Sequence, residues 1–125
     1  MGFSMNKVIL VIEDQEDNRR IMHDLLTSAD FQVLDAVTGE EGVSSAEQHK
    51  PDLILMDIQL PDIDGYEATR RIKANPDLKS IPIIAVTSYA LSGDDIKAFE
   101  AGCDAYVSKP FSPRALLAKI RQILS

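Results

Sequence analysis

Several side chains capable of chemistry share one position in this sequence, because each stands at or directly after the end of a short apolar run. They are three carboxylates, a hydroxyl and an ammonium: Glu13, Asp14, Asp57, Thr87 and Lys109. Where such runs form parallel strands, their carboxyl ends lie along one edge of the sheet, and open α/β sheets bind ligands at that edge. We therefore expect these five side chains to come together in one site.

The charge of such a site predicts its ligand. Clustered carboxylates repel one another, since two unit charges 4 Å apart cost about 4 kcal/mol at an effective dielectric of 20. A hard divalent cation offsets that repulsion, and a site with few protein oxygens and several waters suits Mg²⁺ better than Ca²⁺. One Mg²⁺ and Lys109 together neutralise the three carboxylates, and a neutral pocket can admit a phosphoryl group that the bare acids would repel. The pattern indicates Mg²⁺-dependent phosphoryl chemistry.

Apolar runs alternate with amphipathic stretches along the whole chain. The apolar runs predict strands at 8–12, 31–37, 53–56, 83–86 and 105–107. The amphipathic stretches predict helices at 19–29, 38–49, 66–74, 92–101 and 113–124. Strict alternation of strands and helices is typical of a parallel sheet, and right-handed crossovers then favour a doubly wound α/β fold with helices on both faces.

Local signals mark the ends of several predicted helices. Residues 38–41 and 92–95 both have the form Ser/Thr-x-x-Asp/Glu, in which the first side chain caps a helix N-terminus. Ser112 can cap the last helix, with Pro113 at its first helical position. Gly102 is the expected stop of the fourth helix.

Composition limits the functions that the chain can have. Its 125 residues suit one domain. Lys and Arg number 13 against 20 Asp and Glu, which gives a net charge of −7 and argues against a nucleic-acid partner and against a polybasic membrane anchor. The acids are concentrated in residues 1–65, where 14 acids meet 4 bases, whereas residues 66–125 carry 6 acids and 9 bases.

The remaining features favour a reducing, cytoplasmic location. The single cysteine, Cys103, excludes an intrachain disulfide and a cysteine-based zinc site. The apolar run 8–12 is far shorter than the roughly 20 residues that cross a membrane, and no signal peptide is recognisable. Met5 and the two residues after it look like a natural start, so we expect residues 1–5 to lie outside a single domain at 6–125.

The strand-end residues, taken in order, resemble the receiver domain of two-component response regulators over essentially the whole of 6–124. The matching pieces are residues 13–14, 57–61, 64–65, 87–88 and 106–111. Each piece is weak evidence alone, but all of them in order at the strand ends are specific. The resemblance is to stand-alone receivers of the CheY and DivK type, and it implies a flavodoxin-like sheet with strand order 2-1-3-4-5 and no fused output domain.

The resemblance implies a phosphoacceptor and a metal site. Asp57 would take a phosphoryl group from the phosphohistidine of a histidine kinase or a histidine phosphotransfer protein, forming an acyl phosphate. Asp14, Asp57 and the backbone carbonyl of Gln59 would hold Mg²⁺, or Mn²⁺ in its place, with Glu13 bound through water. Glu13 stands where many receivers have Asp. Gln59 and Tyr89 match positions that tune the lifetime of the phosphoryl group in the family.

The resemblance also implies a switch. Thr87 and Lys109 would contact the phosphoryl oxygens, and a cis bond before Pro110 would aim the ammonium into the pocket. The Thr87 hydroxyl would move to the phosphoryl group, and Tyr106 would turn into the space it leaves. This would remodel the face formed by the fourth helix, the fifth strand and the fifth helix, where a downstream protein, or a second copy on phosphorylation, would bind.

Other functions are compatible with the same strand pattern to different degrees. A flavodoxin-like electron carrier is disfavoured, because residues 13–17 contain four acids that would repel a flavin phosphate. A haloacid dehalogenase-type hydrolase needs a second Asp two residues after its nucleophile, where this chain has Gln59, and no Walker A loop is present. An inert receiver-fold interaction module stays open as an alternative. We expect a signalling domain and not an enzyme.

Overall fold

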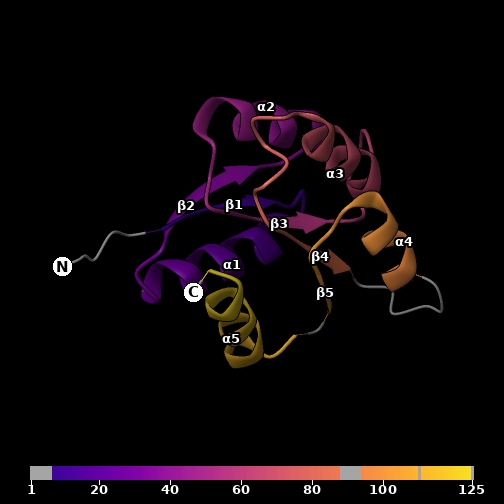
Figure 1. The fold of residues 1–125 in the computed structure, drawn as a ribbon. Helices are drawn as coiled ribbons and strands as arrows, with labels where there is room; N and C mark the ends of the chain where they lie inside the picture. The colour runs from indigo at the N-terminus through magenta and orange to yellow at the C-terminus, as the bar shows by residue number, and fades with distance from the viewer. Residues whose placement is uncertain (1–6, 88–93, 110, 125) are drawn as a thin grey trace.

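The structure is a computed structural model, in which we describe residues 7–87, 94–109 and 111–124, without the side chains of 94 and 95. Strands and helices alternate along this chain (Figure 1). They are β1 (Val8–Ile12), α1 (Glu16–Ser28), β2 (Gln32–Ala36), α2 (Gly39–His49), β3 (Leu53–Asp57), α3 (Gly65–Ala74), β4 (Ile83–Thr87), α4 (Asp94–Ala101), β5 (Ala105–Ser108) and α5 (Pro113–Leu124).

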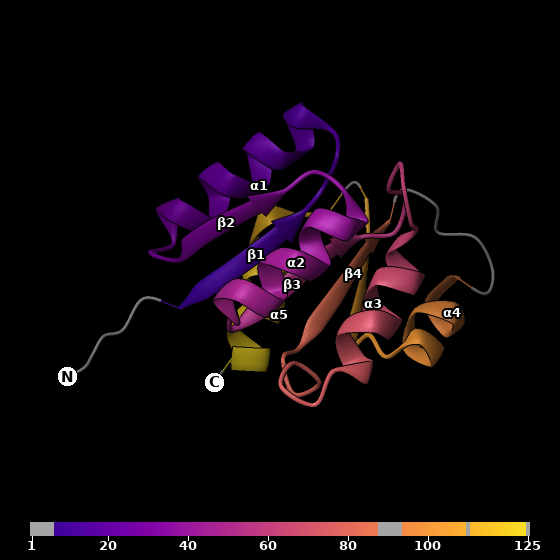
Figure 2. The ribbon, with the colours of Figure 1, turned by 90° about the horizontal axis from the view of Figure 1, so that it is seen from above.

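The strands form one parallel sheet between two layers of helices. The strand order is β2-β1-β3-β4-β5, and every pair of neighbouring strands is parallel. Figures 1 and 2 show α1 and α5 on one face of the sheet and α2, α3 and α4 on the other. The predicted doubly wound fold and its strand order are confirmed.

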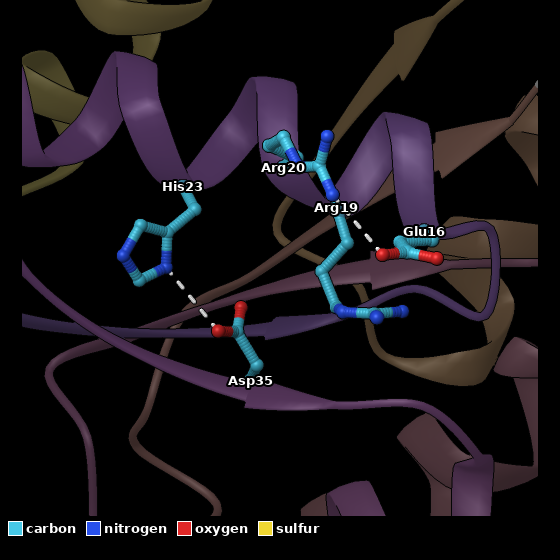
Figure 3. Close-up of a pocket in the computed structure, with 5 residues that line it drawn as sticks. All are labelled: Glu16, Arg19, Arg20, His23 and Asp35. Atoms are coloured by element: carbon cyan, nitrogen blue, oxygen red, sulfur yellow. Dashed lines mark hydrogen bonds and ion pairs between the residues drawn. The ribbon is translucent and has the colours of Figure 1, made fainter.

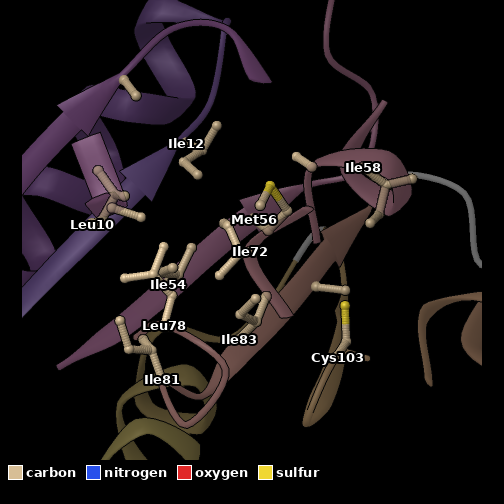
Figure 4. Packing of buried hydrophobic residues seen from close by; sticks show 14 of the residues in the cluster. Leu10, Ile12, Ile54, Met56, Ile58, Ile72, Leu78, Ile81, Ile83 and Cys103 are labelled. Atoms are coloured by element: carbon tan, nitrogen blue, oxygen red, sulfur yellow. The ribbon is translucent and has the colours of Figure 1, made fainter. Parts of the chain in front are cut away.

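Buried side chains alternate between the two faces, because successive residues of a strand point to opposite sides. Leu10 and Ile12 of β1 pack with Ile54 and Met56 of β3 in the cluster beneath α2, α3 and α4 (Figure 4). Their neighbours, such as Ile9, join the cluster beneath α1 and α5. Each fully buried side chain of this size contributes roughly 1.5–3 kcal/mol, so both clusters hold the central strands, and with them the strand ends, in fixed positions.

The helix starts differ from the sequence predictions in informative ways. α1 begins at Glu16, three residues before the predicted start, because its first turn is polar and carries no apolar stripe. Acidic residues there are favoured by the helix dipole. At α2, the Thr38 hydroxyl accepts from the Glu41 N–H as predicted, but the Glu41 carboxylate accepts from the Val37 N–H and not from Thr38.

The later helices agree with prediction where the structure describes them. The Ser112 hydroxyl accepts from the Ala115 N–H, and α5 begins at Pro113. Gly102, with φ of 114°, follows the last residue of α4. The cap predicted at Ser92 lies outside the described residues. Across the described ranges, no helix combines the length and apolar character needed to cross a membrane.

Candidate functional site

Three acidic side chains meet at the carboxyl edge of the sheet. β1 and β3 are neighbours with Ile12 beside Met56, so the residues that follow them are adjacent. Glu13, Asp14 and Asp57 each place a carboxylate oxygen within 4.8 Å of the other two. Glu13 is 0% exposed and Asp57 4%, so the structure brings the predicted carboxylates together in a largely buried cluster.

Lys109 places a positive charge beside this cluster. Its Nζ donates to Glu13 Oε1 at 2.7 Å, and the two side chains are 14% and 0% exposed. The other Glu13 oxygen accepts from the Gln15 N–H at 3.1 Å. The backbone of Lys109 is itself fixed, because its N–H donates to the Thr87 carbonyl at 2.7 Å. Glu13 is therefore a buried charge with partners on both oxygens, as burial of a carboxylate requires.

The surroundings of Asp57 disfavour its ionised form. Burial, together with hydrogen bonding to and repulsion by Glu13, raises the pKa of Asp57 to about 7, although the Gln59 N–H and the Lys109 charge act in the opposite direction. The Gln59 N–H donates to Asp57 Oδ1 at 3.1 Å. A carboxyl that resists ionisation near neutral pH indicates that the protein atoms alone do not balance the negative charge of the site.

The donor set fits a hard divalent cation. Three carboxylates lie together, and one ammonium faces them, which leaves an excess of negative charge. Oxygen donors of this kind are the ligands that Mg²⁺ prefers, with waters completing its coordination. The predicted metal-binding set of Glu13, Asp14, Asp57 and the Gln59 carbonyl is thus chemically suited to Mg²⁺.

The predicted switch residues share one face of the sheet. Thr87, 1% exposed, ends β4 beside the Asp57 strand. Tyr106 is paired with Ala85 in the β4–β5 register and packs against the cluster beneath α2, α3 and α4. Because Thr87 is two residues beyond Ala85, it points to the same face as Tyr106. The lifetime position Tyr89 and the cis-peptide candidate Pro110 lie outside the described residues.

Arg19 is a site residue that the sequence analysis did not single out. Its Nη1 donates to the backbone carbonyls of Glu13 at 3.1 Å and Asp14 at 3.5 Å. Figure 3 shows Arg19 in a hollow between α1 and β2, whose other lining residues form the ion pairs Glu16–Arg20 and His23–Asp35. Arg19 therefore fixes the backbone that carries the two acids. Because it bonds to backbone carbonyls, no pattern of residue types could have marked it in the sequence.

Comparison with known proteins identifies the family and supports the fold. Residues 9–121 match the response regulator receiver domain. The chain belongs to this family. It is 39% identical over 120 residues to the polar-differentiation response regulator DivK of Brucella ovis, covering 96% of this chain and 98% of DivK. It is therefore a DivK- and CheY-like receiver of two-component systems.

Solved structures extend the similarity to three dimensions. A response regulator from Chloroflexus aurantiacus superposes with a TM-score of 0.92 at 31% identity, covering 96% of this chain and 98% of that one. The receiver domain of the sensor histidine kinase PA1611 from Pseudomonas aeruginosa superposes with a TM-score of 0.90 at 37% identity, over 96% and 98% of the two chains. That receiver holds a magnesium ion in its active site cleft.

Proposed function

We propose that Asp57 accepts a phosphoryl group from the phosphohistidine of a histidine kinase or a histidine phosphotransfer protein, in a reaction that needs Mg²⁺. The observation that carries this proposal is the buried cluster of Glu13, Asp14 and Asp57 facing Lys109. An Asp57 oxygen attacks phosphorus, the phosphorus–nitrogen bond breaks, and the electron pair returns to the imidazole of the donor. The products are an acyl phosphate on Asp57 and a free histidine.

The residues around Asp57 serve positioning and charge neutralisation, which account for most catalysis of phosphoryl transfer. Glu13 and Asp14 would hold the Mg²⁺, with the Gln59 carbonyl, and a bound ion would neutralise charge on the phosphoryl oxygens. Lys109 already lies beside the cluster and can turn its ammonium from Glu13 to the incoming group. The same positive charges favour the ionised form of Asp57, which is the nucleophile.

The acyl phosphate would act through protein contacts and not through a further reaction on another substrate. Thr87 and Tyr106 occupy the same sheet face, so movement of one hydroxyl toward the phosphoryl group changes the space open to the aromatic ring. On α4, Ile96 is 59% exposed and Phe99 51%. These exposed apolar side chains support the proposal that a cytoplasmic partner, or a second copy of the chain, binds the face formed by α4, β5 and α5.

Phosphoryl acceptance is tested by incubating the protein with acetyl phosphate and Mg²⁺ and measuring its intact mass. Wild type is expected to gain one phosphoryl mass, Asp57→Asn to gain none, and omission of Mg²⁺ to prevent the gain. A wild-type protein that stays unmodified, while a control receiver is phosphorylated in parallel, would favour the inert interaction module.

The switch is tested separately with Tyr106→Ala. The variant keeps Asp57 and its neighbours, so it should gain the phosphoryl mass as wild type does. Pull-downs with and without the phosphodonor should then lose the phosphorylation-dependent partner seen with wild type. Unchanged partner binding by a phosphorylated Tyr106→Ala variant would contradict the proposed switch while leaving phosphoryl acceptance intact.

A further inference from the structure

The loop that follows β3 is attached to the start of α2 by one side chain. Asp62 accepts hydrogen bonds from the Gly39 N–H through Oδ1 and the Glu40 N–H through Oδ2, both at 2.8 Å. The first amides of a helix have no partners within the helix, and the helix dipole favours a negative charge beside them. Desolvation opposes ionisation of Asp62, but the N–H groups of Glu40 and Gly39 outweigh it and lower its pKa.

The same junction is closely packed. A Cβ on Gly39 would overlap Ile63 Cγ1 and lie 3.0 Å from the Ile63 carbonyl oxygen. Only glycine allows the start of α2 to approach the loop this closely. The two Asp62 hydrogen bonds thus belong to a fitted contact between the loop and the helix.

The other end of the loop is closed against the phosphoacceptor strand. The Gly65 N–H donates to the Ile58 carbonyl at 2.9 Å, and a Cβ on Gly65 would lie 2.5 Å from the Asp57 carbonyl oxygen. The carbonyl of Gln59 belongs to the proposed metal site. In the sequence, Gln59 lies between Ile58, where the loop is closed, and Asp62, where it is attached to α2. Its N–H donates to the Asp57 side chain. A shift of the loop would therefore move the Gln59 peptide groups relative to Asp57.

We propose that Asp62 is a positioning residue for the metal site: by attaching the β3–α3 loop to the N-terminus of α2, it holds the Gln59 carbonyl in place relative to Asp57. This inference rests on the proposed function, because it concerns the same metal ion. Asp62 touches neither the cluster nor a phosphoryl group, and it acts through the loop alone. The competing explanation is that Asp62 only caps α2.

Thr38 offers a matched control, because it caps the same end of α2 from the helix side. Its hydroxyl accepts from the Glu41 N–H at 3.0 Å. Thr38→Ala therefore weakens the start of α2 without removing the Asp62 attachment of the loop. Asp62→Ala removes the cap and that attachment together, whereas Asp62→Asn keeps one oxygen that can accept from α2.

The experiment measures Mg²⁺ binding by isothermal titration calorimetry and the melting temperature by circular dichroism for all four proteins. Asp62→Ala is expected to raise the Kd for Mg²⁺ about tenfold, as loss of supporting contacts around a metal site commonly does. Asp62→Asn should give an intermediate Kd. Thr38→Ala should lower the melting temperature like Asp62→Ala and keep the wild-type Kd.

Two results would overturn the inference alone: an unchanged Kd in Asp62→Ala and Asp62→Asn, or an equal rise in Thr38→Ala. If Asp62→Ala does not fold, the comparison of Asp62→Asn with Thr38→Ala decides in the same way. A wild-type protein that binds no Mg²⁺ would overturn the proposed function, and this inference with it.

Discussion

Both edges of the sheet carry charged side chains at the ends of strands, but the partners of these side chains differ. Asp52 accepts from the Val8 N–H at 2.7 Å, and Asp104 from the Ile83 N–H at 2.8 Å. Lys73 Nζ donates to Asp104 and to two backbone carbonyls. At the amino edge, each of these charged side chains forms hydrogen bonds with backbone groups and so connects one element to another.

At the carboxyl edge, the carboxylates face one another. Glu13 raises the pKa of Asp57, and Lys109 alone does not offset this effect. A fold tolerates a buried charge when it supplies partners for that charge. The paired charges of the amino edge therefore help to hold the fold together. At the carboxyl edge the partners present offset the negative charge only in part, so this edge is suited to bind a cation. The difference between the two edges can be tested with matched substitutions.

The largest difference between the two edges is expected when their lysines are replaced, Lys109 at the carboxyl edge and Lys73 at the amino edge. Lys109→Met should slow the gain of phosphoryl mass from acetyl phosphate by about 100-fold or more, as loss of a transition-state donor does. It should also destabilise the protein by about 3 kcal/mol, because Glu13 is left buried without its cation. Intact-mass time courses and urea unfolding measure the two effects.

Lys73→Met is the control from the amino edge. It should lower the free energy of unfolding, because Lys73 bridges three oxygens, and leave the phosphorylation rate unchanged. Equal slowing by both lysine variants would mean that the rate reflects general stability and not the charge at Asp57.

The free energy of unfolding is expected to depend on pH through Asp57. Folding raises the pKa of Asp57 from 3.8 to about 7, so between these values the folded protein binds a proton that the unfolded chain has lost. The free energy of unfolding of wild type should therefore fall as pH rises from about 4 through 7. In buffer with EDTA at pH 8, Asp57→Asn should be more stable than wild type by on the order of 2–4 kcal/mol.

Urea unfolding of both proteins at pH 5 and pH 8 measures this difference. The gap between Asp57→Asn and wild type should widen with pH and shrink when Mg²⁺ replaces EDTA. A gap that is constant over this range would show that Asp57 ionises without cost, and the contrast between the two edges would lose its basis.

The smallest expected effect is stabilisation by Mg²⁺ itself. Once Mg²⁺ exceeds its Kd, each further tenfold increase should add about 1.4 kcal/mol to the stability of wild type. Asp14→Asn should lose most of this increment, whereas Asp52→Asn, at the amino edge, should keep it. Melting curves over a Mg²⁺ series, with NaCl holding ionic strength constant, provide the measurement. Equal responses of the two variants would place the binding elsewhere.

The sequence predicted the fold and the position of the acids because both depend on local patterns. The central strands are continuous apolar runs, and their ends follow directly from where those runs stop. Adjacency of Glu13 and Asp57 also needs β1 beside β3, and that strand order came from the resemblance to receiver domains. The start of α1 was misplaced because its first turn has no apolar residues to reveal it.

Contacts to the backbone were not predictable in the same way. Arg19 and Asp62 bond to peptide groups, which every residue possesses, so no pattern of residue types marks the partner. The Asp62 contact joins positions 23 residues apart, and its existence depends on how closely α2 approaches the loop. Likewise, the sequence placed Lys109 in the site but did not identify Glu13 as its partner.

The ion pair between Glu13 and Lys109 has a mechanical consequence. It joins residues 96 positions apart. These residues follow β1 and β5, which β3 and β4 separate in the sheet, so the ion pair links the ends of two strands that are not neighbours. Displacement of the end of β5 would thus be felt at the acids after β1. By thermodynamic linkage, a partner that binds more tightly to one position of β5 would change the free energy of forming the acyl phosphate, and the acyl phosphate would change that partner's affinity by the same factor.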